Sequence, residues 1–302
     1  MDRSQNSSDH PRVVSLVPSA TEILRHLGVE PVGISHCCEN RDTGAVVLTS
    51  SIVPNGLSQG EIDRFVSAAS AKGESLYRVN EALLDRLRPD LILTQGVCDV
   101  CAVGADEVAR ANACLARETP TVFLNGTKLE DLYTDIAIVG DGIGRDVSSE
   151  IAALRARVEA VRAAIAGRSM PRVAFVEWLD PPFLGGHWVP DMLAAAGAVA
   201  IGPASGVPSP RSTWAEIANE RPDVLLFSFC GYSLQATLAD LAALPDLAAN
   251  ALPSVTNQYA LDAQYYCQLT PKAVRGIEIL AGLLYPDVWP APGTLEAAST
   301  HG

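Results

Sequence analysis

Short apolar runs alternate with longer segments of helical periodicity along most of this chain. The apolar runs predict strands at 13–17, 32–35, 46–48, 91–94, 121–125, 172–176, 223–229 and 255–261. The periodic segments predict helices at 21–29, 81–90, 104–117, 190–197 and 271–286. Because strands that alternate with helices form mostly parallel sheets with helices on both faces, we expect an α/β fold.

One segment interrupts this alternation. Residues 145–168 read RDVSSEIAALRARVEAVRAAIAGR and contain no Gly or Pro before Gly167, which predicts a single helix about 35 Å long. The chain is therefore divided into an N-terminal lobe at 12–144, a linking helix at 145–168 and a C-terminal lobe at 169–290. The Pro-, Gly- and Ala-rich tail after Pro286 is expected to be loose at its end.

Composition narrows the class of protein. A net charge of −13 and a pI near 4.8 argue against nucleic acid and against an anionic membrane surface, because both require clustered Lys and Arg. No apolar stretch reaches the length of a membrane-spanning helix, and the N-terminus has no apolar signal region. A cytoplasmic location is expected, where seven cysteines indicate metal binding, catalysis or burial rather than disulfides.

Six of the seven cysteines follow predicted strands. Ligands of open parallel sheets lie beyond the carboxyl ends of the strands, where these cysteines would gather in a cleft between the lobes. They are Cys37, Cys38, Cys98, Cys101, Cys230 and Cys267. The C-x-x-C spacing of Cys98 and Cys101 lets two thiolates reach one metal ion or one cluster edge. Cys114 falls in a predicted helix and is assigned to packing.

Several metal centres fit these cysteines. Four thiolates suit structural zinc, and three with an open position suit a [4Fe–4S] cluster. Adjacent cysteines seldom both bind one ion, so only one of Cys37 and Cys38 is expected to be the stronger ligand. A thioredoxin-like redox pair at Cys98 and Cys101 is a weaker interpretation, because it leaves the other cysteines unexplained.

Aromatic, imidazole and amide side chains also follow predicted strands and are candidates for ligand binding. They are His36, Gln95, Trp178, His187, Trp188, Tyr232, Tyr265 and Tyr266. Packing alone is an equal explanation for Trp188, and it is expected for at least one of the three tyrosines. Ser19 or Thr21 is expected to cap the helix that follows, with a ligand contact as the alternative.

The chain resembles the helix-linked substrate-binding proteins of ABC importers, in the branch related to the vitamin B12-binding periplasmic protein. The segments RVVSLVPSATEILRHLGV and RPDLIL carry the resemblance, which covers roughly residues 12–286. A leaderless subgroup labelled cobalamin-binding is more similar still. It shares His36-Cys37-Cys38, the CDVCAV run from Cys98 to Val103, Glu177 to Pro181, Gly186 to Pro190 and Cys230-Gly231.

The resemblance implies two Rossmann-like lobes joined by one long helix, a corrinoid ligand, and Cys38 as the stronger of the two adjacent ligands. Two stretches depart from the subgroup. Glu39-Asn40-Arg41 replaces an Asp-Tyr-Pro sequence, and Gln268 to Lys272 replaces an Arg-rich run. Because both fall near the expected site, the ligand can differ from that of the relatives.

Three functions remain open. The first is a cytoplasmic binding protein that holds a corrinoid or another metal-containing cofactor in the cleft between the lobes. The second is an iron–sulfur- or zinc-dependent enzyme that acts on a small substrate with the same cysteines. The third is a scaffold that binds zinc only for stability.

Overall fold

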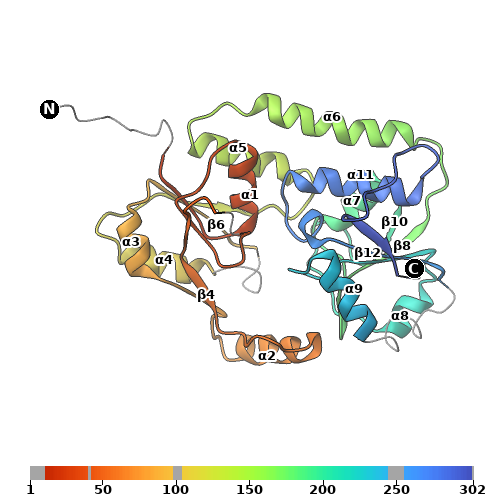
Figure 1. The fold of residues 1–302 in the computed structure, drawn as a ribbon, viewed down its shortest axis with the longest axis horizontal. Helices are drawn as coiled ribbons and strands as arrows, with labels where there is room; N and C mark the ends of the chain where they lie inside the picture. The colour runs from red at the N-terminus through yellow and green to blue at the C-terminus, as the bar shows by residue number, and fades with distance from the viewer. Residues whose placement is uncertain (1–10, 40–41, 98–103, 244–254, 301–302) are drawn as a thin grey trace. The chain divides into compact units, whose positions relative to one another are not determined.

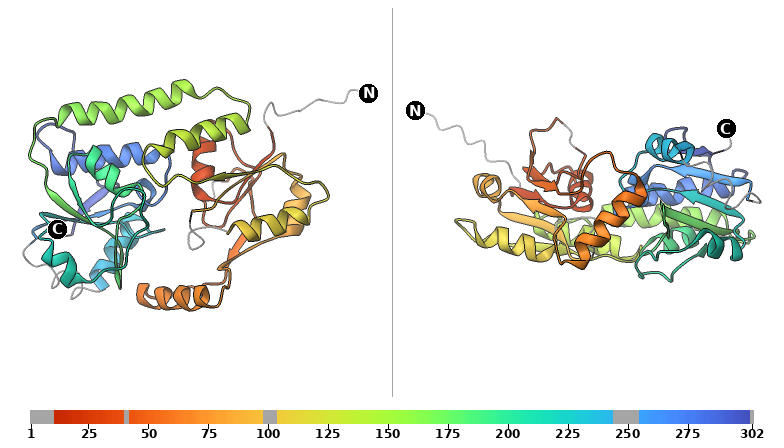
Figure 2. Two further views of the ribbon diagram at one scale, coloured as in Figure 1. Left: turned by 180° about the vertical axis from the view of Figure 1, so that it is seen from behind. Right: turned by 90° about the horizontal axis from the view of Figure 1, so that it is seen from below.

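The structure is a computed structural model that describes residues 11–39, 42–97, 104–243 and 255–300. The chain divides into two compact units, drawn as ribbons in Figures 1 and 2. Unit 1 comprises the residues up to Pro54, Ala68–Asn125 and Thr134–Ser148. Unit 2 comprises Asn55–Ser67, Gly126–Tyr133 and the residues from Ser149 onward. Each unit is described by itself.

Unit 1 is built on a five-stranded parallel sheet in the order β3-β2-β1-β6-β7. Its strands are β1 (Val13–Ser15), β2 (Gly33–Ile34), β3 (Val46–Val47), β6 (Leu91–Gln95) and β7 (Thr121–Leu124). In the central strand, Val14 lies opposite Gly33 on one side and Ile92 on the other. All three are fully or nearly fully buried, as expected for a sheet covered on both faces.

Four helices contribute to unit 1. They are α1 (Pro18–His26), α3 (Glu81–Leu87), α4 (Ala105–Ala113) and the later part of α5 (Asp131–Gly142). Helix α1 presents Ile23 and Leu24 to the core, where both are fully buried. Helix α3 begins where Asn80 accepts a hydrogen bond from the backbone N–H of Leu83 at 3.0 Å, which satisfies one free donor of the first turn.

A two-stranded antiparallel sheet and the helix between its strands were not expected from the sequence, and the helices at 131–142, 214–219 and 234–243 were not predicted either. Strand β4 (Thr49–Ser51) pairs with β5 (Tyr77–Val79), and helix α2 (Gln59–Ala71) lies between them in the chain. Most of α2 is assigned to unit 2, although both strands belong to unit 1. A sequence signal for this helix was present, because Ser58 and Glu61 form the S-x-x-E pattern of a helix start. The Glu61 carboxylate accepts hydrogen bonds from Ser58 N and Oγ, both at 2.8 Å.

Unit 2 contains a larger sheet in the order β10-β8-β11-β12-β13, with β9 paired to β8. Its strands are β8 (Arg172–Leu179), β9 (Pro182–Leu184), β10 (Val199–Ile201), β11 (Val224–Phe227), β12 (Asn257–Leu261) and β13 (Ala297–Ser299). Strands β10, β8, β11 and β12 are parallel, whereas β9 and β13 run antiparallel to their neighbours. The expectation of a loose tail is therefore wrong for residues 297–299, which form the edge strand β13.

The helices of unit 2 surround this sheet. They are α6 (Ser148–Ala164), α7 (Val189–Ala195), α8 (Trp214–Asn219), α9 (Leu234–Ala243), the 3-10 turn η1 (Ala263–Tyr265) and α11 (Lys272–Leu284). Helix α6 is shorter than the predicted 145–168 helix, and nearly all of it belongs to unit 2. Figure 1 shows α6 beside α11, where Arg157 and Glu278 form an ion pair at 2.8 Å. Among the described residues, no helix has the length and apolar character needed to cross a membrane.

Candidate functional site

Buried hydroxyl groups gather at the carboxyl edge of the unit 1 sheet. Thr21 Oγ1 donates to Ser15 Oγ at 2.8 Å, and Ser15 Oγ donates to the carbonyl of Val17 at 2.9 Å. Helix α1 begins at Pro18 behind the N-cap Val17, which makes no side-chain cap. The expectation that Ser19 or Thr21 caps this helix is therefore wrong, because the helix starts earlier and Thr21 lies inside it.

His36 is held firmly in this edge, one residue after Ser35 and close to Thr49. Its ring atom Nδ1 lies 2.6 Å from Thr49 Oγ1, and its backbone N–H donates to the same oxygen at 2.9 Å. Thr49 Oγ1 also lies 3.0 Å from Ser35 Oγ, and the imidazole lies against the Tyr77 ring with centroids 5.3 Å apart. Burial lowers the pKa of His36, so the neutral imidazole is favoured at pH 7.

The two adjacent cysteines lie in different surroundings. Cys37 is exposed, and its Sγ lies 3.3 Å from Nε2 of His36. Cys38 is buried, and its Sγ lies 3.1 Å from Thr21 Oγ1. Burial raises the pKa of the Cys38 thiol to about 11, and the protein atoms packed around one side of the Cys37 sulfur raise the pKa of that thiol as well. The resemblance implies Cys38 as the stronger ligand, whereas the structure makes Cys37 the accessible thiol and Cys38 a neutral buried one.

The carboxyl ends of β6 and β7 in unit 1 carry fewer polar contacts. Gln95 is half-buried at the end of β6, and Gly96 N donates to Asn125 Oδ1 at 3.1 Å after β7. Thr94 Oγ1 is buried without a hydrogen-bond partner in the described part of the chain. Cys98 and Cys101 lie outside the described residues, so their role as metal ligands stays a prediction.

The carboxyl edge of the unit 2 sheet forms an aromatic corner, which we define as Trp178, Leu179, Tyr232 and Asp240. The Trp178 and Tyr232 rings meet edge to face at 6.1 Å. Asp240 accepts a hydrogen bond from Tyr232, and burial together with this carboxylate raises the pKa of the phenol. Trp178 and Tyr232, which were predicted from the sequence as ligand-binding residues, are half-buried, so part of each ring is accessible to a ligand.

His187 and Trp188 lie in a tight loop between β9 and α7. Their rings stack at 5.7 Å, and Trp188 Nε1 donates to the carbonyl of Tyr266 at 2.6 Å. Gly186 is required in this loop, because a Cβ there would lie 2.4 Å from Ser209 N. Burial lowers the pKa of His187. The bonded indole favours packing for Trp188, and His187 is half-buried beside it.

The loop after β12 contains three further candidates. Tyr266 is fully buried, its hydroxyl donates to the carbonyl of Gly276 at 3.3 Å, and its ring packs on Phe175. Such a side chain does not reach a ligand, so Tyr266 is the tyrosine that serves packing. Tyr265 is half-buried, and Cys267 donates weakly from Sγ to the carbonyl of Ser228 at 3.7 Å.

The cysteines that the structure describes do not form one metal centre. In the described ranges, no group of three or more His, Cys, Asp and Glu side chains is arranged to hold a metal ion. Cys37 and Cys38 belong to unit 1, whereas Cys230 and Cys267 belong to unit 2, where Cys230 is exposed after β11. Cys114 is exposed at the end of α4 and hydrogen-bonded to Glu81, so its assignment to packing is wrong.

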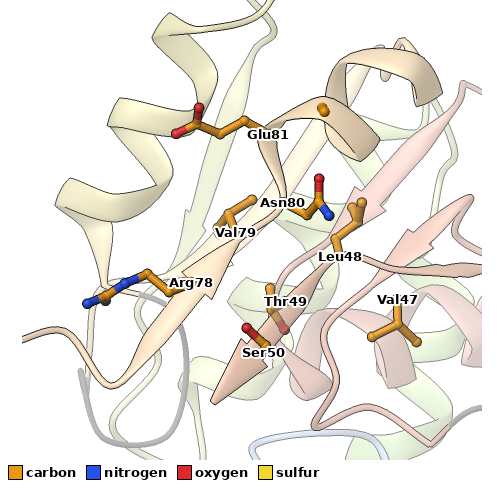
Figure 3. Close-up of a pocket in the computed structure, with 9 residues that line it drawn as sticks. Val47, Leu48, Thr49, Ser50, Arg78, Val79, Asn80 and Glu81 are labelled. Carbon is orange, nitrogen blue, oxygen red and sulfur yellow. The ribbon is translucent and has the colours of Figure 1, made fainter. Parts of the chain in front are cut away.

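Two surface pockets have no predicted residue in their lining, although Thr49, which bonds the His36 ring, lines the first of them. A pocket of about 510 Å³ in unit 1 is bounded by β3 to β5 and the start of α3 (Figure 3). In Figure 3, Arg78 and Glu81 lie at opposite ends of one side of the pocket, and Val47 lies on the other side. The two charged groups therefore do not point toward a common centre. A pocket of about 340 Å³ in unit 2 lies between β10 and α8, beside Ile201 and Glu216. Neither is lined by a predicted site residue.

Solved structures share this fold. A periplasmic heme-binding protein from Pseudomonas aeruginosa matches with a TM-score of 0.66 and 18% identity, over 96% of this chain and 98% of that chain. An ABC transporter substrate-binding protein from Listeria monocytogenes EGD-e has a TM-score of 0.65 and 16% identity, over 92% and 99%. The periplasmic vitamin B12-binding protein BtuF of Vibrio cholerae has a TM-score of 0.60 and 18% identity, over 91% and 97%.

These likenesses confirm the predicted α/β fold of the helix-linked, two-lobed kind. No protein-family model matches the sequence, and the comparison with curated proteins finds no match. The chain therefore has the fold of ABC-transporter substrate-binding proteins, and its ligand has to be argued from its own residues.

The sequence reasoning did not find three residues that organise these edges. Thr49 and Tyr77 hold the His36 ring, and Gln59 contacts the aromatic corner. Thr49 and Tyr77 lie on the unexpected strands β4 and β5, and Gln59 starts the unexpected helix α2. Only the Ser58–Glu61 pattern gave a sequence signal for any of them.

Proposed function

We propose that this protein binds a metal-containing tetrapyrrole of the corrinoid type and holds its metal through His36. The fold supports this class of ligand, because proteins that share it include a vitamin B12-binding protein and heme-binding proteins. The ligand metal is cargo in this proposal, and the protein contributes donor atoms and flat apolar surfaces.

The arrangement around His36 is the observation that carries the proposal. Histidines that bind metals usually fix one ring nitrogen by a hydrogen bond and present the other to the metal. With the proton on Nδ1, the ring donates to Thr49 Oγ1, the Thr49 hydroxyl donates to Ser35 Oγ, and the Nε2 lone pair faces the exposed Cys37, whose Sγ lies 3.3 Å away. The lowered pKa of His36 favours the neutral ring that such binding needs.

Cys37 lies beside this donor atom, with its Sγ 3.3 Å from His36 Nε2. The metal of a tetrapyrrole already has four ring nitrogens and takes one further donor on each face, so His36 alone is the metal donor of this proposal. The raised pKa of Cys37 keeps its thiol neutral, and a neutral thiol can donate a hydrogen bond to Nε2 when no ligand is bound.

A titration of the metal-free protein with aquocobalamin and with hemin, followed by absorption spectroscopy, tests the proposal. Binding to the wild-type protein is expected to shift the absorption bands of the ligand. His36→Ala is expected to raise the dissociation constant at least tenfold. His26→Ala is the matched control, because His26 is exposed at the end of α1. Absence of binding in wild type, or equal binding by His36→Ala, would contradict the proposal.

The purified protein also allows the binding-protein hypothesis to be distinguished from the enzyme hypothesis. Anaerobic purification followed by metal analysis, on wild type and on Cys98→Ala/Cys101→Ala, measures any resident iron or zinc. Stoichiometric iron with broad visible absorption that is lost in the double variant would favour a cluster enzyme. Cobalt with corrin bands that persist in the variant would favour the binding protein.

A cytoplasmic location is part of the proposal. It is supported by the five cysteines that the structure describes, which carry thiols rather than disulfides, as expected in a reducing compartment. Fractionation of cells that express the native gene, with a periplasmic marker beside it, is expected to place the protein in the cytoplasmic fraction. Recovery with the periplasmic marker would contradict this.

A further inference from the structure

Gln59 occupies the aromatic corner of unit 2, although the chain on either side of it leads to strands of unit 1. The segment Asn55–Ser67 is assigned to unit 2, and Gln59 is only 1% exposed. Its Oε1 accepts from the backbone N–H of Leu179 at 2.6 Å, and its Nε2 donates to Asp240 Oδ2 at 2.9 Å. Its own carbonyl accepts from Trp178 Nε1 at 3.2 Å.

These contacts define a site for a carboxamide. The corner meets the side-chain amide with one N–H donor from Leu179 and one carboxylate acceptor in Asp240, while the Trp178 indole holds the backbone carbonyl of Gln59. A primary amide satisfies both kinds of group, since it has a carbonyl oxygen to accept and an NH₂ to donate. A carboxylate would face Asp240 with a second negative charge and no proton to donate, which buried sites reject strongly.

The docking of this segment fully buries few of its residues. Of residues 55–67, only Gln59 and Gly60 are buried. Asp63 adds an ion pair to Arg211 at 2.7 Å, and the Arg211 side chain is half exposed. Segments with few buried apolar contacts open locally at low cost in free energy, because water replaces their hydrogen bonds.

Gly60 brings the helix start very close to this edge. A Cβ at Gly60 would lie 2.4 Å from Asp180 Oδ2, so a larger residue there would displace the Asp180 carboxylate. The close approach lets the Gln59 side chain reach Leu179 and Asp240 together. The segment is therefore shaped to deliver one amide group to this corner.

We propose that the corner formed by Trp178, Leu179, Tyr232 and Asp240 is a carboxamide subsite, which Gln59 fills until an amide of the ligand replaces it. This inference rests on the proposed function and narrows its ligand class. Corrinoids carry carboxamides around the ring, whereas hemes carry carboxylates, so the subsite selects corrinoids. Trp178 and Tyr232 supply apolar faces beside the amide.

Two probes with the same corrin ring test the subsite. Cobyric acid carries six carboxamides, and cobyrinic acid carries carboxylic acids at the same positions. Binding of both is measured by calorimetry on wild type, Gln59→Ala and Asp240→Asn. Arg64→Ala is the control, because Arg64 is exposed on the same helix.

Wild type is expected to bind cobyric acid at least tenfold more tightly than cobyrinic acid. Gln59→Ala should strengthen cobyric acid binding about tenfold, because the internal competitor is gone. Asp240→Asn should reduce the preference for the amide form, since an asparagine can donate to a carboxylate. Arg64→Ala should match wild type.

Amide exchange of wild type gives an independent measurement that needs no variant to fold. Residues 58–67 are expected to exchange faster than β8 in the free protein, and faster again with cobyric acid bound. Exchange as slow as that of β8, unaltered by the ligand, would overturn the subsite. Equal affinity for the two probes in wild type would also overturn it but leave corrinoid binding standing, whereas no tetrapyrrole binding by wild type or Gln59→Ala would refute both.

Discussion

Replacement of Thr49 by valine tests whether His36 is positioned as a metal donor. Thr49 Oγ1 has three partners, the backbone N–H of His36, the ring Nδ1 of His36 and the Ser35 hydroxyl, at 2.6 to 3.0 Å. Valine keeps the shape of the side chain but leaves these groups without the oxygen, at a 7% exposed position. A buried polar group that loses its partner costs about 1–3 kcal/mol.

Two quantities are expected to change in Thr49→Val. The free energy of unfolding of unit 1 should fall by about 1–3 kcal/mol, measured by urea denaturation with amide exchange of residues 33–38. Affinity for the metal of aquocobalamin should fall by about 10–100-fold, the usual effect of removing a group that orients a metal-binding histidine. Thr49→Ser retains the hydroxyl and should restore affinity.

Ser50→Ala is the matched control, because Ser50 is the exposed neighbour on the same strand. Its unfolding free energy should lie within about 0.5 kcal/mol of wild type. The reasoning would be refuted if Thr49→Val lost stability yet bound the ligand as wild type does. That result would show that the hydroxyl supports the fold and that His36 does not depend on it for binding.

Two further predictions concern the loop of unit 2 that carries His187. Gly186→Ala should lower the free energy of unfolding by more than about 2 kcal/mol, because the new Cβ would lie 2.4 Å from the backbone atom Ser209 N. Thermal melts measure this loss, with Gly293→Ala as the control, because a Cβ at Gly293 would meet nothing closer than 3.4 Å. For His187, burial lowers the folded pKa below the unfolded value, so its contribution to stability is present above the unfolded pKa and is lost as pH falls through the folded pKa. NMR titration should place the pKa of His187 below 6.5, and a pKa at or above 6.5 would disprove this account. His187→Asn, in which asparagine tolerates the local φ of 49°, should lose less stability than wild type on acidification.

The alternation of apolar runs and helical segments was enough to predict most of the fold. The predicted strands overlap β1, β2, β3, β6, β7, β8, β11 and β12. The central strands β1, β6 and β11 are almost entirely buried, so their residues form continuous apolar runs that are easy to recognise, whereas the edge strand β3 is partly exposed. Strands β4, β5, β9, β10 and β13 were missed because they are short or lie at edges, where such runs are absent.

The candidate site was predictable only in part, for a related reason. His36, Trp178 and Tyr232 were found because the rule for parallel sheets places them at strand ends. The rule gives the position of a residue along the chain, but burial of its side chain depends on packing in three dimensions. Hence it could not separate exposed Cys37 from buried Cys38, or exclude the core residue Tyr266.

Gln59 shows what pattern reasoning cannot reach at all. A glutamine at a helix start is ordinary in sequence, and its burial is favourable only because Leu179 and Asp240 meet its amide in space. An amide in an apolar site would cost free energy without those two partners, so the corner must offer both a donor and an acceptor. Because the same two groups would also accept an amide of a ligand, a residue that looked structural indicates which ligand chemistry the corner can bind.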